Sequence, residues 1–100
     1  MPREIIDVPV ISEAIRRLGA PTSAGVRFGE LVMTCGMPPI DPVTGEIVAG
    51  DIRTQTRAVL EALRVTLEHA GSSLDKVIKA TVYVTDPSRY SVSRRDVDRP

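Results

Sequence analysis

The chain has 100 residues, enough for one domain, and its thirteen basic and thirteen acidic side chains leave no net charge. A neutral chain is not expected to bind nucleic acid, because affinity for phosphates comes from concentrated positive charge. It also gives no reason to expect binding to a membrane surface. One cysteine and one histidine cannot form an internal disulfide or an ordinary metal site.

The N-terminus shows no targeting or membrane signal. Residues 1–4, MPRE, carry charges of both signs with no long apolar run behind them, so no signal peptide is expected. No apolar run approaches the roughly 20 residues that cross a bilayer. We therefore expect a cytoplasmic protein without a membrane segment.

The first quarter of the chain predicts a short strand and a helical turn. Residues 4–10, EIIDVPV, are typical of a strand with Pro9 near its end. The run SEAIRRLG predicts a helix with Ser12 as its N-cap and Gly19 as its stop. A loop rich in proline, serine and glycine follows over residues 20–25.

A hairpin and a turn are predicted next. Residues 26–28 and 31–35 flank a Gly-Glu dipeptide, which is typical of two strands joined by a tight turn. The prolines at 38–39 cannot donate backbone hydrogen bonds, so the second strand must stop near Met37. Residues 41–45, DPVTG, predict a turn, because Asp caps it, Pro presets φ and Gly supplies a positive φ.

The clearest helix is predicted over residues 52–70. Asp51 is a good N-cap, Gly71 ends the helix, and His69 in the last turn complements the helix dipole. One stripe recurs at spacings of three and four and consists of Ile52, Thr56, Val59, Leu60, Leu63, Leu67 and Ala70.

The best strand pattern lies at residues 77–85, VIKATVYVT. Its alternate residues form one apolar face and one amphipathic face. The order strand, long helix, strand suggests a crossover unit, right-handed if the strands are parallel. Asp86 followed by proline predicts the start of another helix, and residues 88–100 form a locally positive tail.

Residues 26–90 also carry a sequence of motifs that matches a known family in order and spacing. A strand ends in Cys35-Gly36-Met37, and a proline and the motif Asp-Pro-Val-Thr-Gly follow. Then come a helix with Gln-Thr-Arg near its start and Ala-Gly at its end, and a strand that reads Val-Ile-Lys-Ala-Thr-Val-Tyr-Val-Thr-Asp. In these features the chain resembles the reactive-intermediate deaminase (Rid) family, formerly called L-PSP endoribonucleases or translation inhibitors.

The resemblance implies an α+β fold of the chorismate-mutase-like type, assembled as a homotrimer with small-molecule clefts between subunits. It implies hydrolysis of reactive enamines and imines, released by pyridoxal-phosphate enzymes, to 2-keto acids and ammonia, without metal or cofactor. In the family an arginine holds the substrate carboxylate and a glutamate near the C-terminus positions water. This division of roles is chemically sound, because an imine carbon is already electrophilic and needs mainly orientation and activated water.

This sequence departs from the family pattern at the pocket. Cys35 stands where the family has serine, Met37 where it has glutamine, Thr22 where a loop tyrosine is frequent, and Arg94 where a pocket asparagine occurs. The expected substrate-binding residues are therefore Thr22, Cys35, Gly36 and Met37, and the catalytic residues are unknown. The family arginine and glutamate, and the last two family strands, have no counterpart: the chain is truncated or altered, or is a relative with a different end.

Each candidate residue has a simpler alternative role. Cys35 is either a buried apolar residue at a strand end or a thiol lining the cleft beside the Gly36 N–H group. A nucleophilic role is disfavoured, because no histidine is near in sequence. Met37 is expected to pack, and Arg94 and Arg95 are expected to be solvated, although they could supply a carboxylate site.

Two functions remain open from the sequence. The first is a Rid-type deaminase, impaired in this chain by the missing arginine and glutamate. The second is a non-catalytic trimeric module that binds small metabolites or a protein partner. Ribonuclease activity is disfavoured, because three aromatic residues offer no stacking platform for RNA.

Overall fold

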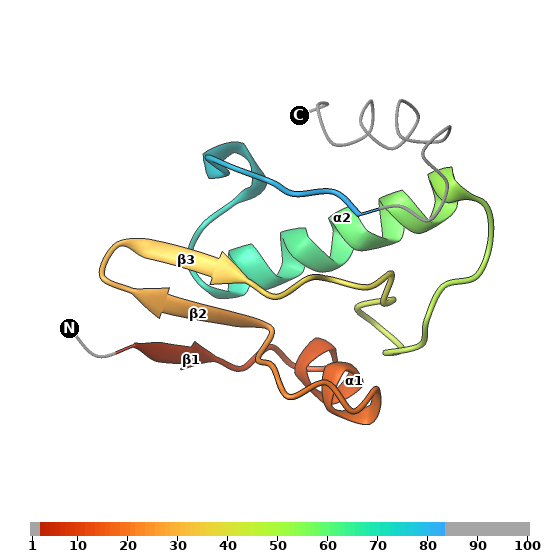
Figure 1. The fold of residues 1–100 in the computed structure, drawn as a ribbon, viewed down its shortest axis with the longest axis horizontal. Helices are drawn as coiled ribbons and strands as arrows, with labels where there is room; N and C mark the ends of the chain where they lie inside the picture. Colours follow the sequence, from red (N-terminus) through yellow and green to blue (C-terminus); the bar gives the residue numbers. More distant parts are fainter. Residues whose placement is uncertain (1–2, 84–100) are drawn as a thin grey trace.

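A computed structural model describes residues 3–83 of the chain. The elements in chain order are β1 (Glu4–Ile6), α1 (Ile11–Arg17), β2 (Gly25–Phe28), β3 (Leu31–Thr34), α2 (Ile52–His69) and the 3₁₀ turn η1 (Leu74–Lys76). Figure 1 shows α2 running along the three strands and α1 at the end of the sheet. Helices packed on an antiparallel sheet confirm the predicted α+β class.

The sheet has the order β1-β2-β3, and both pairings are antiparallel. The pairing Phe28 with Leu31 closes the hairpin around Gly29 and Glu30, as the sequence predicted. Gly29 has a φ of 62°, in the left-handed region that a two-residue hairpin turn requires. The first strand is shorter than predicted and ends at Ile6.

Alternation along the strands gives the sheet two different faces. The inner face lies toward α2: a Cβ atom added at Gly25 would lie 3.7 Å from the Thr66 Cγ2 atom, and the Arg27 guanidinium donates to the Ala70 carbonyl. The register places the opposite set of residues on what we call the outer face: Ile5, Val26, Phe28, Leu31 and Met33. Met33 is 65% exposed there, so an apolar face is left uncovered in the single chain.

The core lies between α1, the end of β1 and the C-terminal half of α2. Its buried apolar members are Ile6, Val8, Ile11, Ala14, Ile15, Ala24, Ile40, Ala62 and Ala70. The structure corrects the predicted role of Ser12, which lies inside α1 and is not its N-cap. Its Oγ atom accepts a hydrogen bond of 2.8 Å from the buried Val8 N–H group. A hydroxyl that the sequence assigned to the helix start therefore satisfies a backbone group of the core.

Helix α2 begins and ends close to the prediction. The Asp51 carboxylate accepts a hydrogen bond of 2.8 Å from the Thr54 N–H group, which confirms the N-cap, and Gly71 has a φ of 84° just past the end. The predicted apolar stripe is only partly buried. Thr66 is fully buried although it was outside the stripe, and its hydroxyl donates to the Ala62 carbonyl at 2.9 Å.

The predicted strand over residues 77–85 is wrong for the part that the structure describes. Residues 77–83 join no sheet, and Ile78 is 87% exposed. A pattern with a period of two produces a strand only where a neighbouring strand supplies hydrogen bonds, and none of the described strands pairs with this segment. The predicted crossover is therefore not formed within residues 3–83. The helix expected after Asp86, the tail at 88–100 and the two arginines at 94–95 lie outside the described residues.

Candidate functional site

Three predicted site residues, Cys35, Gly36 and Met37, follow each other directly after β3. The Cys35 N–H group donates to the Ala24 carbonyl at 3.0 Å, and the Thr34 hydroxyl donates to the Cys35 carbonyl at 3.1 Å. Cys35 and Met37 are half-buried and pack against the core. Gly36 between them is exposed, and no heavy atom lies within 4 Å of the place a Cβ atom would take. The strand exit thus presents an accessible stretch of backbone on a fixed support.

The Cys35 thiol is held in a form that reacts poorly. Burial raises the pKa of the Cys35 thiol, and a hydrogen bond to its own backbone offsets this only in part. The thiol therefore stays protonated at neutral pH, and the thiolate is the reactive species. A protonated thiol is a poor nucleophile, and the role of Cys35 stays a prediction.

The loop after the strand exit is braced at its turn. The Asp41 carboxylate accepts hydrogen bonds from the N–H groups of Val43 at 2.8 Å and Thr44 at 3.3 Å, and Gly45 has a φ of 78°. The Arg17 guanidinium donates to the Gly45 carbonyl at 3.3 Å and ties the turn to α1. The predicted structural role of this turn is confirmed.

Thr22 lies at a different place from the strand exit. It lines a hollow of about 260 Å³ together with residues of β1, α1 and the loop before β2, among them Asp7, Arg16 and Ala24. Residues 35–37 are not part of this lining, and the two places meet only where Ala24 accepts the hydrogen bond from Cys35. A single chain therefore does not bring the four predicted residues into one pocket.

Sequence reasoning missed this hollow. No local sequence pattern signals it, because its lining is brought together from β1, α1 and the loop before β2. The Arg16 guanidinium lies 3.1 Å from the Glu13 carboxylate and 3.8 Å from the Asp7 carboxylate, so the polar rim of the hollow is already neutralised.

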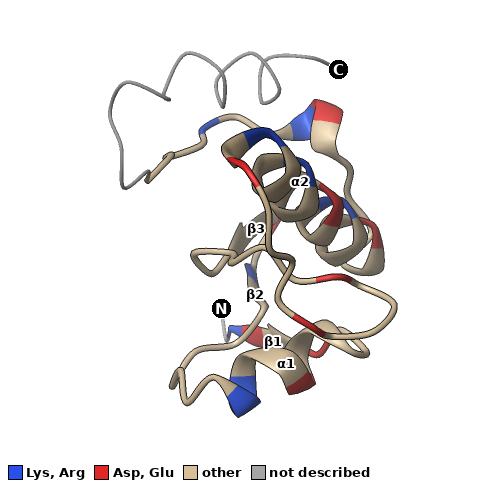
Figure 2. Ribbon diagram, turned by 90° about the vertical axis from the view of Figure 1, so that its right-hand side faces the viewer, with Lys and Arg blue, Asp and Glu red and all other residues tan. Residues whose placement is uncertain are grey.

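Four arginines are committed to partners within the chain. Arg16 pairs with two carboxylates, Arg17 with a carbonyl, Arg27 with the Glu4 carboxylate at 3.6 Å and a carbonyl, and Arg64 with two glutamates of α2. Figure 2 shows charges of both signs alternating along α2. None of these four guanidiniums is left as an unpaired clamp for a substrate carboxylate. Within residues 3–83 no group of three or more His, Cys, Asp or Glu side chains could hold a metal ion.

The part of the chain that the structure describes holds no helix long and apolar enough to cross a bilayer.

Comparison with known proteins places these features in one family. The family model described as "Endoribonuclease L-PSP" matches residues 14–97. A RutC family protein of Pyrococcus abyssi is 48% identical over 71 residues, 71% of this chain and 56% of the relative. TdcF of Escherichia coli K12, named as a candidate reactive intermediate deaminase, is 42% identical over 83 residues, which are 81% of this chain and 64% of TdcF. The chain thus spans between about half and two-thirds of these relatives.

Solved structures carry the same fold. A Rid family protein of unknown function from Yersinia pestis superposes with a TM-score of 0.82 at 30% identity, over 95% of this chain and 72% of that one. A Haemophilus influenzae protein gives a TM-score of 0.77 at 33% identity, over 96% of this chain and 70% of that one. The sheet and helices of residues 3–83 are therefore the arrangement seen in those structures, with a three-stranded sheet here.

Proposed function

This chain belongs to the endoribonuclease L-PSP family, also called the Rid family, and from that membership we propose that its site takes small 2-imino acids and their 2-keto acid products. The proposed reaction is hydrolysis: water adds to the iminium carbon, the carbon–nitrogen bond breaks, and a 2-keto acid and ammonium leave. The observation that carries the proposal is the 42% identity to TdcF over 83 residues. We propose that this activity is impaired in the 100-residue chain.

We place the binding site at the strand exit. Its support is the exposed backbone of Gly36 between two half-buried residues, Cys35 and Met37. The Gly36 N–H group would donate to the substrate carboxylate, and the protonated Cys35 thiol would line the cleft as a weakly polar wall. Thr22 would enter the same cleft from a neighbouring copy, because it lies away from the strand exit of its own chain.

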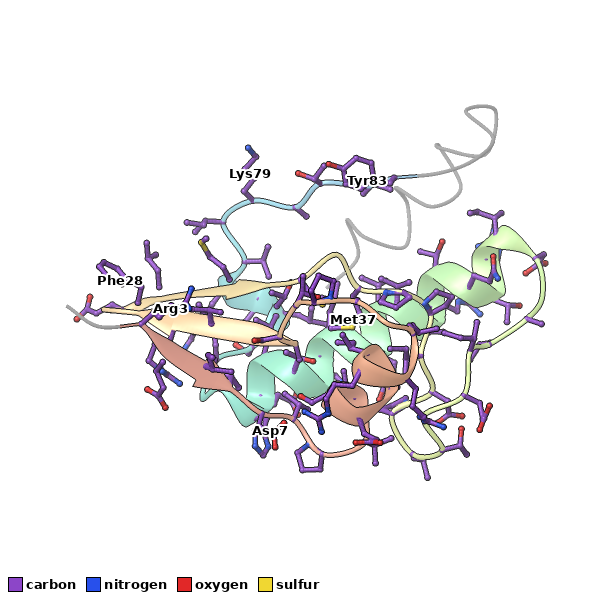
Figure 3. The ribbon with its side chains drawn as sticks, turned by 60° about the horizontal axis from the view of Figure 1, so that its bottom comes forward. Arg3, Asp7, Phe28, Met37, Lys79 and Tyr83 are labelled. Carbon is purple, nitrogen blue, oxygen red and sulfur yellow. The ribbon has the colours of Figure 1, made fainter. Side chains whose placement is uncertain are left out.

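A cleft between copies requires an assembly, which we propose is a homotrimer. The outer face offers five apolar side chains per copy, and Phe28 projects from the hairpin end of the sheet (Figure 3). Fully burying a large apolar side chain contributes about 1.5–3 kcal/mol. Covering Phe28, Leu31 and Met33, all more than half exposed, therefore supplies a strong driving force for association.

A non-catalytic binding module is the second candidate. The commitment of Arg16, Arg17, Arg27 and Arg64 to partners within the chain favours it, because a deaminase needs a guanidinium free to hold the carboxylate. Losing a positioned acid or base also costs about 10²–10⁴-fold in rate. Under this alternative the chain binds a 2-keto acid without converting an imine.

One experiment separates the two candidates. An amino-acid oxidase generates a 2-imino acid in situ, and its decay is followed with and without the chain, while 2-oxobutanoate binding is followed by the amide NMR signals. Weak but measurable acceleration, with shifts at Gly36, supports the impaired deaminase; shifts without acceleration support the binding module. If the chain causes no acceleration and shows no NMR shifts, both candidates are refuted.

Two variants of one residue test the proposed donor. Gly36→Pro removes the N–H group, whereas Gly36→Ala retains it, and the open space around Gly36 accommodates either side chain. We expect the proline variant to weaken 2-oxobutanoate binding about tenfold, since a charge-assisted hydrogen bond contributes about 1.5–3 kcal/mol, and the alanine variant to bind normally. Equal binding by the two variants would remove Gly36 from the site.

A further inference from the structure

The hollow beside α1 has a base that belongs to the core of the molecule. The buried residues of its lining are Ile6, Ser12 and Ala24. The hydrogen bond of 2.8 Å from the Val8 N–H group fixes the Ser12 Oγ atom there. Ile6 is held in the sheet, where β1 pairs it with Gly25 of β2. Because these contacts belong to the fold itself, the base of the hollow is already formed before a ligand arrives.

Two opposite charges lie on the rim of the hollow. Arg16 is on α1, and Asp7 lies where the chain passes from β1 toward α1 (Figure 3). The Arg16 Nη1 atom is 3.8 Å from the Asp7 Oδ1 atom, which is close enough for attraction but too long for a hydrogen bond. A guanidinium has five N–H donors, and the Glu13 carboxylate accepts from Nη2 of Arg16 at 3.1 Å. The rim therefore presents further guanidinium donors beside a carboxylate acceptor.

Size and charge together limit what this hollow can bind. Its volume is about 260 Å³, whereas sites for drug-sized ligands hold about 300–1,000 Å³, so only a smaller molecule fits. A simple anion would meet the Asp7 carboxylate and a simple cation would meet the Arg16 guanidinium, and like charges placed together weaken a complex. A ligand that carries one charge of each sign avoids both conflicts. The lining residues Ile5 and Pro21 add apolar surface for the rest of such a ligand.

We propose that this hollow binds a free α-amino acid with a short aliphatic side chain. The carboxylate of the ligand pairs with Arg16 and its ammonium group with Asp7, through charge-assisted hydrogen bonds. An α-amino acid carries both groups on one carbon atom, which suits two rim charges only 3.8 Å apart. The aliphatic side chain then lies on the buried base formed by Ile6 and Ala24.

This amino-acid site is separate from the strand exit. Residues 35–37 are not part of its lining, and the proposed 2-keto acid ligand of the strand exit has no ammonium group for Asp7 to bind. Thr22 also lines the hollow, but the proposed ion pairs with the ligand use only Asp7 and Arg16. Direct binding measurements therefore test this proposal whether or not the chain is a deaminase.

Titration of the 100-residue chain with L-valine, followed by the amide NMR signals, tests the proposal. We expect shifts at Asp7, Arg16 and Ala24 by about 20 mM, because so small a ligand is expected to bind in the millimolar range. Two probes with the same branched skeleton serve as controls: 3-methylbutanoate lacks the ammonium group, and 2-methylpropan-1-amine lacks the carboxylate. Each should bind about tenfold more weakly than L-valine, since each loses one charge-assisted pair. No shifts, shifts confined to Gly36, or equal binding of the three probes would overturn the proposal.

Three variants assign the two charges of the ligand. Arg16→Gln and Asp7→Asn each remove one rim charge, and we expect each to weaken L-valine binding about tenfold. Arg17→Gln is the matched control, because the Arg17 guanidinium donates to the Gly45 carbonyl and does not line the hollow. It should bind L-valine normally, and a loss as large as that in Arg16→Gln would show that the effect is structural.

The Asp7→Asn variant also gives a change of preference that a structural effect would not produce. It should weaken L-valine about tenfold yet leave 3-methylbutanoate binding unchanged or stronger, because only the amino acid uses the Asp7 carboxylate. Glu13→Gln should strengthen L-valine binding by up to about fivefold, since an exposed ion pair that competes for Arg16 contributes about 0–1 kcal/mol. An unchanged preference in Asp7→Asn, or weaker binding in Glu13→Gln, would refute the assigned pairs.

Discussion

Substitutions of Ser12 test whether its hydroxyl satisfies a buried backbone group or caps helix α1. In the structure it lies 7% exposed inside α1 and accepts the N–H group of Val8, which is fully buried. Replacing Ser12 by alanine leaves that N–H group without an acceptor. An unsatisfied buried backbone group costs about 1–3 kcal/mol, so the Ser12→Ala variant should lose that much free energy of unfolding.

A glycine variant separates this role from helix capping. At an N-cap, serine to alanine costs about 1 kcal/mol and serine to glycine only a few tenths. Inside a helix, glycine loses the acceptor and adds about 1 kcal/mol of helix propensity relative to alanine. The structure therefore predicts that Ser12→Gly is less stable than Ser12→Ala, by about 1 kcal/mol, whereas an N-cap role predicts the opposite order.

Urea unfolding followed by circular dichroism measures both variants at one protein concentration. Equal slopes of free energy against urea confirm that the difference lies in stability and not in the size of the transition. Glu13→Ala is the matched control on the same helix, because it removes only an exposed ion pair with Arg16, which contributes about 0–1 kcal/mol. A Ser12→Gly variant more stable than Ser12→Ala would refute the buried-acceptor role and restore the N-cap prediction.

Three further predictions concern the site, the turn and the assembly. Because burial raises the pKa of the Cys35 thiol, iodoacetamide should modify it slowly at pH 7 and faster toward pH 10, and fast labelling at pH 7 would contradict a protonated thiol. Gly45→Ala should cost more stability in urea than Gly19→Ala. Both residues have a φ of 78°, but only at Gly45 would the new Cβ meet other atoms: the Val10 Cγ1 at 3.3 Å, and the Arg17 Nη2 at 2.7 Å, which would have to move from the Gly45 carbonyl that it binds. Equal losses in the two variants would show that these contacts yield without cost. Leu31→Asp on the outer face should lower the mass measured by light scattering, and an unchanged trimer would place the interface elsewhere.

The sequence by itself determined the features that depend on neighbouring residues. The hairpin around Gly29, the turn braced by Asp41 and the helix capped by Asp51 all form where they were predicted. Each depends on a side chain or a φ value within a few residues, so the local sequence contains its cause. The family motifs likewise follow the order of the chain, and the comparisons confirm the membership they indicated.

The tertiary structure decided what depends on partners far apart in the chain. Among residues 3–83, the segment 77–83 has the alternation of a strand but pairs with none of the described strands, and alternation by itself supplies no hydrogen bonds. Ser12 bonds to Val8 because α1 folds back on the end of β1. Thr22 lies apart from the strand exit, since their separation is set by packing and not by spacing in the sequence.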